Sequence, residues 1–459
     1  MDLIKEILLN SPLLALLSGL VAYIMATRFN LYPIIIYVSK TKGLMDEPGE
    51  RRVHSSKVPN LGGMGIFITF SLTLILFEPF LNNTVSDLSH LLSLLSATII
   101  LLFLGIKDDL VFITPKKKLV IQLIAVSMVC ILQDVRITNF QGIFGIAELH
   151  YFISIVFSVF VFVLVINSLN LIDGIDGLAA SIGILASFCF GICFFMSGYF
   201  LMTLLSAILI GSLVGFLKYN LSVDRKIFMG DTGSMIIGFL LAYQGIEFLN
   251  IKFESISGFT QANMPILLLA ILSFPLFDLL RVFAIRIADK KSPFTADNNH
   301  IHHRLLRLGL SHKQATSLLV FTNLTLVLIA YGTNGLPINL SLIFIVLFGC
   351  ILYLLPFLKV FEEFTINDEV EVPNSKSEKI LDRVEVMSKI NSVALQSQDA
   401  LGNRHIKNYN SLESNTNTIN EKLVRSRADQ FQLLLDNKDD SGNYEKNEVQ
   451  FDSGELNSK

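Results

Sequence analysis

The sequence predicts an all-α membrane protein, with a polytopic bundle of about eleven transmembrane helices and a mostly disordered cytoplasmic C-terminal tail. Of its 459 residues, 52% are hydrophobic and only 16% are charged, and the mean hydropathy is +0.58. Soluble domains carry about 25% charged residues, so this composition excludes an ordinary soluble enzyme. Apolar runs of about 20 residues recur along the chain, as spanning helices require. After residue 360 the composition becomes polar.

Eleven apolar segments are long enough to span a bilayer as helices. They lie near 7–27, 62–80, 91–106, 119–133, 151–168, 177–196, 199–217, 234–250, 264–285, 315–332 and 337–358. The first has no cleavable signal pattern and is interpreted as a signal anchor. The four cysteines all lie inside apolar segments without metal-ligand spacing. We therefore expect no disulfide framework.

Lysine and arginine are concentrated in every second loop. The basic loops are 28–61, 107–118, 218–233 and 286–314, whereas 81–90, 197–198 and 333–336 contain neither residue. The positive-inside rule makes the basic loops cytoplasmic, with the amino terminus outside and the carboxyl terminus inside. Every polar motif described below falls on this cytoplasmic side.

Two domains are expected, a membrane domain at 1–360 and a polar tail at 361–459. The tail has 19 acidic residues against 12 lysines and arginines, and it has few aromatic residues. Such a composition buries too little apolar surface to form a compact core, so we expect disorder.

One polar stretch, 167–177, separates two apolar segments and contains two amides, two carboxylates and two glycines. Asn170 and Asp173 are three residues apart and would share a face at a helix end. Gly174 and Gly177 let a ligand or another backbone come close. Amide and carboxylate oxygens suit a hard cation such as Mg²⁺. The alternative is a polar corner between two helices.

Two further motifs also combine acidic residues with phosphate-binding features. Asp108-Asp109 stands ten residues before Lys118, and adjacent carboxylates repel each other unless a cation or a shared proton compensates. Lys118 suits a phosphate, although a surface ion-pair cluster would also explain the motif. Gly-Asp-x-Gly-Ser at 230–234 would place Asp231 at a helix start, where the dipole favours phosphate. Its alternative is a simple N-cap.

The last motif is His300-Ile301-His302-His303-Arg304, in a basic loop. No cysteine or further histidine completes a tetrahedral zinc set, so zinc is not favoured. Imidazoles and a guanidinium fit a nucleotide diphosphate better. In the preceding apolar segment Asp278 and Arg281 are three residues apart, which predicts an ion pair.

In order and spacing these four motifs resemble the polyprenyl-phosphate N-acetylhexosamine-1-phosphate transferase family, of the glycosyltransferase 4 type. The resemblance covers about residues 40–313. The His-x-His-His-Arg form is similar to the branch that uses UDP-N-acetylglucosamine. The phospho-N-acetylmuramoyl-pentapeptide transferases, with consecutive histidines, are the second choice. Two positions depart from the family: Phe112 replaces a third acid, and Ala296-Asp297-Asn298 replaces Pro-Asp-Arg.

The resemblance implies transfer of a sugar 1-phosphate from a UDP-sugar donor to a polyprenyl phosphate acceptor in the bilayer, with release of UMP. It implies Mg²⁺, with Mn²⁺ as the alternative ion, and no nucleic acid. It places the protein in the cell (inner) membrane, with a homodimer as one option. The implied catalytic residues are Asp108, Asp109 and Asp173; the metal ligands are Asn170 and Asp231; the substrate-binding residues are Lys118, Asp176, His300, His302, His303 and Arg304.

A single in-line displacement is the expected mechanism, with a covalent aspartate intermediate as the lesser alternative. A transporter would place its acids near mid-bilayer and show related halves, and neither feature is present in the sequence. The CDP-alcohol phosphotransferases require Asp-Gly followed by Ala-Arg and two spaced acids, which this chain lacks after Asp176-Gly177. An inactive scaffold is disfavoured because all the expected acids are present.

Overall fold

Helices form at all the long apolar segments of the chain. The computed structural model describes residues 12–46, 58–81, 85–111, 113–251, 263–290 and 300–357. The predicted tail at 361–459 and the basic stretch 47–57 lie outside these ranges. The helices are α2 (Pro12–Arg28), α3 (Leu31–Lys42), α4 (Gly62–Phe77), η1 (Glu78–Phe80), α5 (Val85–Leu110), α6 (Pro115–Leu132), α7 (Tyr151–Ile172), α8 (Leu178–Met196), α9 (Phe200–Asn220), α10 (Gly230–Asn250), α11 (Met264–Ile271), α12 (Ser273–Ala288), α13 (Ile301–Arg307), α14 (His312–Gly332), α15 (Ile338–Leu354) and η3 (Leu355–Phe357).

The predicted all-α membrane fold is confirmed, and a helix or a bent pair of helices lies in each of the eleven predicted segments. Over the described ranges, nine helices are long and apolar enough to cross a membrane, and the bent pair α11–α12 makes a tenth. Helix α6 is the remaining predicted span, and it begins with three lysines. The protein is therefore a multi-pass membrane protein.

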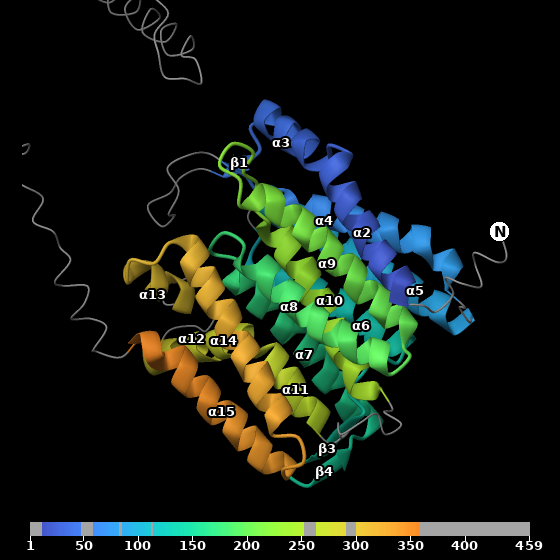
Figure 1. Cartoon of the computed structure of the whole chain (residues 1–459), viewed down its shortest axis with the longest axis vertical. Coiled ribbons are helices and arrows are strands. Elements are labelled where there is room, and N and C mark those ends of the chain that lie inside the picture. The colour runs from blue at the N-terminus through green and yellow to red at the C-terminus, as the bar shows by residue number, and fades with distance from the viewer. Residues whose placement is uncertain are drawn as a thin grey trace, which may run out of the picture. The chain divides into compact units, whose positions relative to one another are not determined.

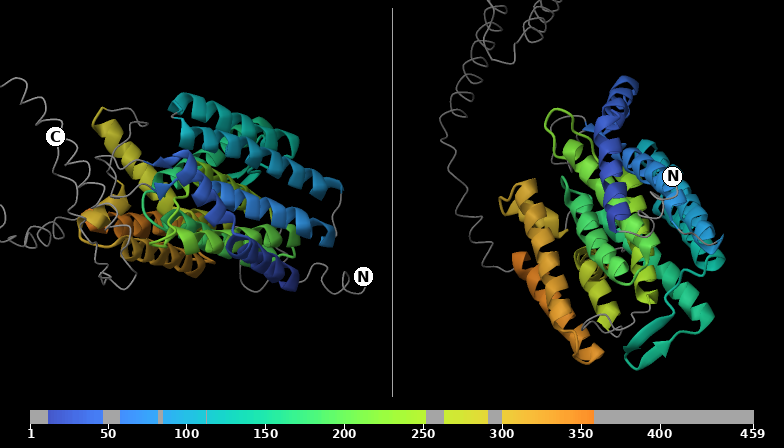
Figure 2. Two further views of the ribbon diagram at one scale, coloured as in Figure 1. Left: turned by 90° about the horizontal axis from the view of Figure 1, so that it is seen from above. Right: turned by 45° about the vertical axis from the view of Figure 1, so that its right-hand side comes forward.

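Helix α10 forms the centre of the bundle (Figure 1). It is mostly apolar after its first turn and is buried along its length, as expected of a helix enclosed by others. Two polar residues near its other end, Gln244 and Glu247, accept hydrogen bonds from Ser206 and Tyr199. It packs against α4, α5, α7, α8 and α11. Helices α2, α9 and α8 lie side by side in that order, while α14 and α15 pack together at one edge (Figure 1 and Figure 2).

Two short hairpins connect helices. The first pairs β1 (Met45–Asp46) with β2 (Val58–Pro59), and the second pairs β3 (Asn139–Ile143) with β4 (Ile146–Glu148). Helix α3 occupies part of the loop predicted at 28–61, because its apolar residues continue beyond α2. It begins after Asn30 and ends at Gly43, both with left-handed backbone conformations.

The apolar segment predicted at 264–285 is not one straight span, since α11 and α12 meet at an angle of 73°. Pro275 has no N–H, and its ring would clash with the carbonyl of Ile271 in a continuous helix. Asn323 of α14 supplies the missing partners: its Nδ2 donates to Ile271 O (3.0 Å) and its Oδ1 accepts from Phe274 N (3.0 Å). The Ser273 hydroxyl also donates to this Oδ1, at 2.9 Å. One side chain thus replaces the backbone hydrogen bonds lost at the bend, which an apolar environment demands.

Replacing Asn323 with leucine is expected to lower the free energy of unfolding by about 2 kcal/mol, because Ile271 O and Phe274 N lose their partner inside the bundle. Thermal unfolding of the purified protein in detergent measures this. Thr322→Val is the matched control, since the exposed Thr322 hydroxyl bonds only to its own helix, at Leu318 O. Equal unfolding midpoints for the two variants would contradict the role given to Asn323.

Candidate active site

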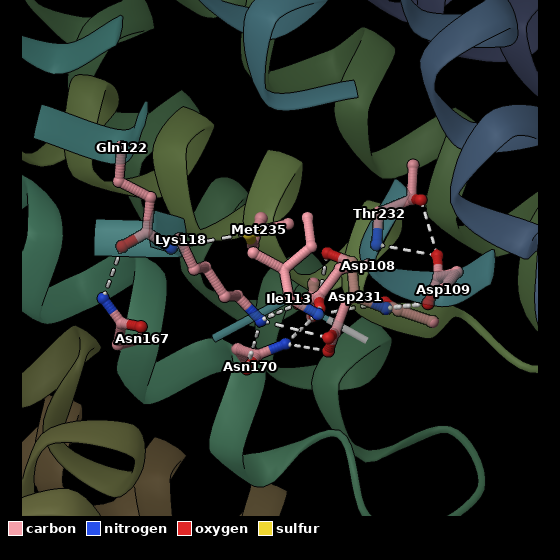
Figure 3. A network of polar contacts seen from close by, with 12 residues as sticks. Asp108, Asp109, Ile113, Lys118, Gln122, Asn167, Asn170, Asp231, Thr232 and Met235 are labelled. Atoms are coloured by element: carbon pink, nitrogen blue, oxygen red, sulfur yellow. Dashed lines mark hydrogen bonds and ion pairs between the residues drawn. The ribbon is translucent and has the colours of Figure 1, made fainter. Parts of the chain in front are cut away.

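The predicted polar motifs meet at one end of the bundle, where α5 and α7 end and where α6, α8, α10 and α14 begin. Alternating helix directions bring these ends together even though the residues are up to about two hundred positions apart. Figure 3 shows the centre of this cluster, with Lys118 surrounded by acids and an amide. The prediction that the motifs form one face is therefore confirmed for the residues that the structure describes.

Lys118 contacts three other polar side chains of the cluster (Figure 3). Its Nζ lies 2.9 Å from Asp108 Oδ2, 3.0 Å from Asp231 Oδ2 and 3.3 Å from Asn170 Oδ1. The Asp108 side chain is 8% exposed and Lys118 13%, whereas Asp231 is 37% exposed. The cluster therefore presents a carboxylate outward over a buried cation.

Asn170 fixes the orientation of the Asp231 carboxylate. Its Nδ2 donates to Asp231 Oδ1 at 2.5 Å and to Ser234 Oγ at 2.9 Å. One turn deeper, Asn167 Nδ2 donates to Gln122 Oε1 at 2.9 Å. Asn167 is on the same helix as Asn170, and Gln122 is on the same helix as Lys118, so a second pair of polar side chains lies next to the first (Figure 3).

Asp109 makes contacts quite unlike those of Asp108. Its Oδ1 accepts from Asp231 N (2.8 Å) and Asn60 Nδ2 (3.2 Å), and its Oδ2 accepts from Thr232 N (3.1 Å) and Thr232 Oγ1 (2.6 Å). The carboxylate therefore satisfies the first free amides of α10, where the helix dipole also favours a negative charge. With four donors, Asp109 anchors the helix that carries Asp231.

Glycines let the chain pack closely around this helix start. Gly62 N donates to Phe228 O (2.9 Å) and Gly63 N donates to Met229 O (2.8 Å). A Cβ on Gly63 would collide with the backbone of Gly233. Gly230 has a φ of 72°, which favours glycine, and its Cα faces the Asp109 carboxylate.

Asp173 lies just after α7, in the loop that leads to α8, and faces the other acids of the site. Burial raises the pKa of Asp173 well above its usual value, and the nearby carboxylates of Asp231, Asp109 and Asp176 raise it further. A group of this kind holds a proton more readily than an ordinary aspartate. It becomes anionic more readily when a cation enters the site.

Asp176, three residues later, contacts basic side chains from two other segments of the chain. Its Oδ2 lies 2.6 Å from Lys226 Nζ and 3.1 Å from His312 Nδ1. Burial by itself would raise the pKa of Asp176, but the hydrogen bonds from His312 and Lys226 outweigh burial and hold it below its usual value. Gly177 N donates to Asn220 Oδ1 at 2.7 Å, which fixes the loop where it enters α8.

In the histidine segment 300–304, His302 is the residue that contacts the 173–177 loop. This side chain is fully buried, neither ring nitrogen has a hydrogen-bond partner among the residues that the structure describes, and a Cβ on Gly174 would collide with its Nε2. Burial lowers the pKa of His302 well below its usual value, and the neighbouring rings of His303, His300 and His312 lower it further. His302 is therefore neutral at pH 7, with unused hydrogen-bonding groups beside the 173–177 loop.

Because the pKa of His302 is depressed by folding, the unfolded chain binds this proton more readily below about pH 6.5. The folded protein should therefore lose about 1 kcal/mol of stability through this group between pH 7.5 and 5.5. His302→Gln should show a correspondingly smaller fall in the unfolding midpoint over this range. His150→Gln, at an exposed histidine, is the control. Parallel pH profiles for wild type and His302→Gln would contradict a neutral buried imidazole.

His300, His303 and Arg304 are placed differently from His302. His300 Nδ1 lies 2.8 Å from Asp278 Oδ2, and Arg304 Nε donates to Pro356 O at 3.1 Å. The rings of His302 and His303 have centroids 4.3 Å apart. The ion pair predicted between Asp278 and Arg281 is wrong, because Asp278 pairs with His300 while the Arg281 guanidinium lies 3.6 Å from the centroid of the Phe357 ring.

The sequence was compared with known proteins. Residues 91–249 match the family described as glycosyl transferase family 4, a range that includes all the acids of the site. This part of the chain is therefore similar to glycosyl transferase family 4.

Several known transferases are 27–29% identical to this chain. A "Probable undecaprenyl-phosphate N-acetylglucosaminyl 1-phosphate transferase" of Bacillus subtilis is 29% identical over 68% of this chain and 84% of its own length. An "Undecaprenyl-phosphate alpha-N-acetylglucosaminyl 1-phosphate transferase" of Escherichia coli K12 is 27% identical over 61% of this chain and 73% of its own. A "Decaprenyl-phosphate N-acetylglucosaminephosphotransferase" of Mycobacterium tuberculosis is 29% identical over 65% and 77%.

The structure brings Asp108, Asp231 and Asn170 together around Lys118. Asp109 lies beside them at the start of α10, and His302 packs on the loop that carries Asp173 and Asp176. The sequence analysis did not single out several residues that hold the site together, namely Asn60, Asn220, Lys226, Thr232, Ser234 and His312. Thr232 and Ser234 lie inside the Gly-Asp-x-Gly-Ser motif and Lys226 lies just before it, so their position was the available signal. Asn220 and His312 had no such signal, since only helix packing brings them to the 173–177 loop.

Proposed function

We propose that this protein transfers N-acetylhexosamine 1-phosphate, in particular N-acetylglucosamine 1-phosphate, from a UDP-sugar to a polyprenyl phosphate and releases UMP. The observation that carries the proposal is the Lys118 cluster, in which a buried ammonium and an outward carboxylate meet at one end of a membrane-embedded bundle. An acceptor that is anchored in the bilayer has to react at such an end. The relatives named above act on prenyl phosphates, which supports the acceptor class.

Asn170 and Asp231 are suited to binding Mg²⁺, with Mn²⁺ as the alternative ion. Their oxygens and the Asp108 carboxylate already surround one cation, the Lys118 ammonium, and the exposed Asp231 carboxylate can take another. Throughout the described ranges no group of three or more His, Cys, Asp or Glu is arranged to hold a metal. Few protein ligands suit Mg²⁺, which keeps waters and takes phosphate oxygens as its remaining ligands. When bound, the ion would offset the charge of the diphosphate.

The reaction is a phosphoryl transfer between anions. An oxygen of the polyprenyl phosphate attacks the phosphorus that carries the sugar, and the bond from this phosphorus to the bridging oxygen breaks as UMP leaves. The acceptor phosphate has a second pKa of about 6 and is mostly dianionic at neutral pH, so it needs little help from a base. The main obstacle is repulsion between the two anions, which Lys118 reduces by binding phosphate oxygens.

The remaining residues have separate roles in this scheme. Asp108, held by Lys118 and by Ile113 N at 3.0 Å, orients the acceptor. Asp109 holds the start of α10 and thereby positions Asp231. Asp173 and Asp176 shape the nucleotide side of the site, and His302 and His303 bind the donor's diphosphate and sugar. Since Arg304 contacts Pro356 O, its assignment to the donor is the least supported by geometry.

The orientation belongs to the same proposal. The described parts of the basic loops 107–118, 218–233 and 286–314 lie at the end of the bundle that carries the site, so the positive-inside rule makes this end cytoplasmic in the inner membrane. Soluble UDP-sugars would reach the site from that side. A homodimer remains an option for its assembly.

The test uses the full-length protein in detergent with undecaprenyl phosphate, Mg²⁺ and labelled UDP-N-acetylglucosamine. Label in the lipid and UMP in equal amounts, both abolished by a chelator and restored by Mg²⁺, is the expected result. Transfer from another UDP-sugar only would change the donor and keep the reaction. No transfer from any UDP-sugar, by a protein that unfolds cooperatively, would overturn the proposal.

A further inference from the structure

Asp278 is a fully buried carboxylate on α12, some distance along the chain from every motif of the site. Its two oxygens have separate partners: Oδ2 lies 2.8 Å from His300 Nδ1, and Oδ1 accepts from Ile301 N at 2.9 Å. His300 is also buried, at 4% exposure. A buried charge is retained only where its partners satisfy it, and here both partners belong to the histidine segment.

Helix α13 depends on this carboxylate for its N-terminal cap. It has seven residues, and the side chain of its own N-cap residue, His300, makes no capping hydrogen bond. A helix this short leaves most of its amides without a partner. Asp278 satisfies the Ile301 amide from a neighbouring helix, and it thereby sets where α13 begins.

The position of α13 determines where its histidines lie. The rings of His300 and His302 are nearly parallel, with centroids 5.5 Å apart and planes 11° apart. His302 packs in turn on Gly174, in the loop between the acids Asp173 and Asp176. A continuous line of contacts thus runs from Asp278 through His300 to His302 and the candidate donor site.

We propose that Asp278 is a positioning residue for donor binding, which acts through His300. A carboxylate can only accept the hydrogen bond, so Nδ1 of His300 is the nitrogen that carries the proton toward Asp278, and Nε2 lies on the far side of the ring. This fixes the ring's orientation and its tautomer, and through the stacked pair it holds His302 against the 173–177 loop. The inference rests on the proposed function, because the donor is what these histidines would bind.

Asp278→Asn separates this role from a purely structural one. The Asn carbonyl oxygen still accepts from Ile301 N, so the cap of α13 is kept. Its NH₂ group now donates to His300 Nδ1, which moves the ring proton to Nε2. We expect the KM for the UDP-sugar to rise about tenfold, with the KM for polyprenyl phosphate and the unfolding midpoint unchanged. Asp289→Asn, at an exposed acid on the C-cap of the same helix, should behave like wild type.

A double variant tests whether the effect passes through His300. An asparagine at position 300 keeps an N–H for Asp278 but has no second ring nitrogen, so Asp278→Asn should cause no further loss in the His300→Asn background. Additive effects would overturn the proposal. A wild-type KM for the donor in Asp278→Asn would also overturn it, as would equal losses for both substrates together with a lower unfolding midpoint.

One readout is independent of transfer. In protein labelled with ¹⁵N-histidine, the signals lost in His300→Asn identify His300, and its Nδ1 should have the shift of a protonated ring nitrogen in wild type and of an unprotonated one in Asp278→Asn. The unprotonated shift in wild type would overturn the assignment. If wild type has the expected tautomer but transfers nothing from any UDP-sugar, the proposed function fails while the Asp278–His300 contact stands.

Discussion

Asp231→Asn is expected to lower kcat/KM for transfer by about a thousandfold or more, a loss typical when a group that stabilises transition-state charge is removed. The asparagine fills the same space and still accepts from Lys118, so the fold should survive. What disappears is the negative charge of the most exposed acid in the Lys118 cluster. Under the proposed function, a divalent cation would then lack its best protein ligand, and the diphosphate would lack the ion that offsets its charge.

The measurement is initial-rate transfer at several Mg²⁺ concentrations, with the unfolding midpoint recorded for each variant. Asp224→Asn is the matched control, since Asp224 is an exposed acid in the loop preceding α10. A rate within tenfold of wild type in Asp231→Asn at saturating Mg²⁺ would show that the ion is held elsewhere. A much lower unfolding midpoint would instead show that Asp231 is needed for folding. The role of the cluster in binding Mg²⁺ would then be tested by the Mg²⁺ dependence of the transfer rate in Lys118→Gln.

Asp109→Asn should reduce both stability and transfer, whereas Asp108→Asn should mainly reduce transfer. In wild type, both carboxylate oxygens of Asp109 accept hydrogen bonds at the start of α10. In the asparagine variant one of these oxygens becomes an NH₂ group, which would face other hydrogen-bond donors. We expect the free energy of unfolding to fall by about 2 kcal/mol and kcat/KM to fall about a hundredfold as Asp231 shifts. Asp108 makes fewer hydrogen bonds, to Ile113 N and Lys118.

Thermal unfolding and transfer rates of the two variants, measured side by side, distinguish these roles. If Asp109→Asn kept the wild-type midpoint and still lost activity, Asp109 would contact substrate directly, as the family resemblance implies. If both variants lost stability equally, the difference in role between the two neighbouring acids would be contradicted.

The chain's local chemistry was readable without a structure. The run lengths of apolar residues placed the spans, because a helix needs about 20 residues to cross a bilayer. Alternating basic loops placed the motifs on one face, and that face contains the cluster around Lys118 and Asn170. These features depend on neighbouring residues only, which is why the sequence predicted them.

The partner of each acid could not be read in the same way. Asp108 and Asp109 are adjacent, but successive residues of a helix point about 100° apart. One therefore meets Lys118 on α6, and the other meets the first amides of α10. The sequence presented them as one motif, while helix packing gave them separate roles.

The contacts of Asp278 and the bend at Pro275 were also not predictable from the sequence. From spacing alone Asp278 was paired with Arg281 on its own helix, and the segment 264–285 was predicted to be one span. The bend at Leu272 turns α12 by 73° relative to α11 and brings Asp278 to His300, with Asn323 closing the bend. The sequence by itself determined the helices, the site's chemical composition and its face. Only the tertiary structure decided which side chains meet, because those contacts depend on helix rotation and crossing angle, which packing between distant segments sets.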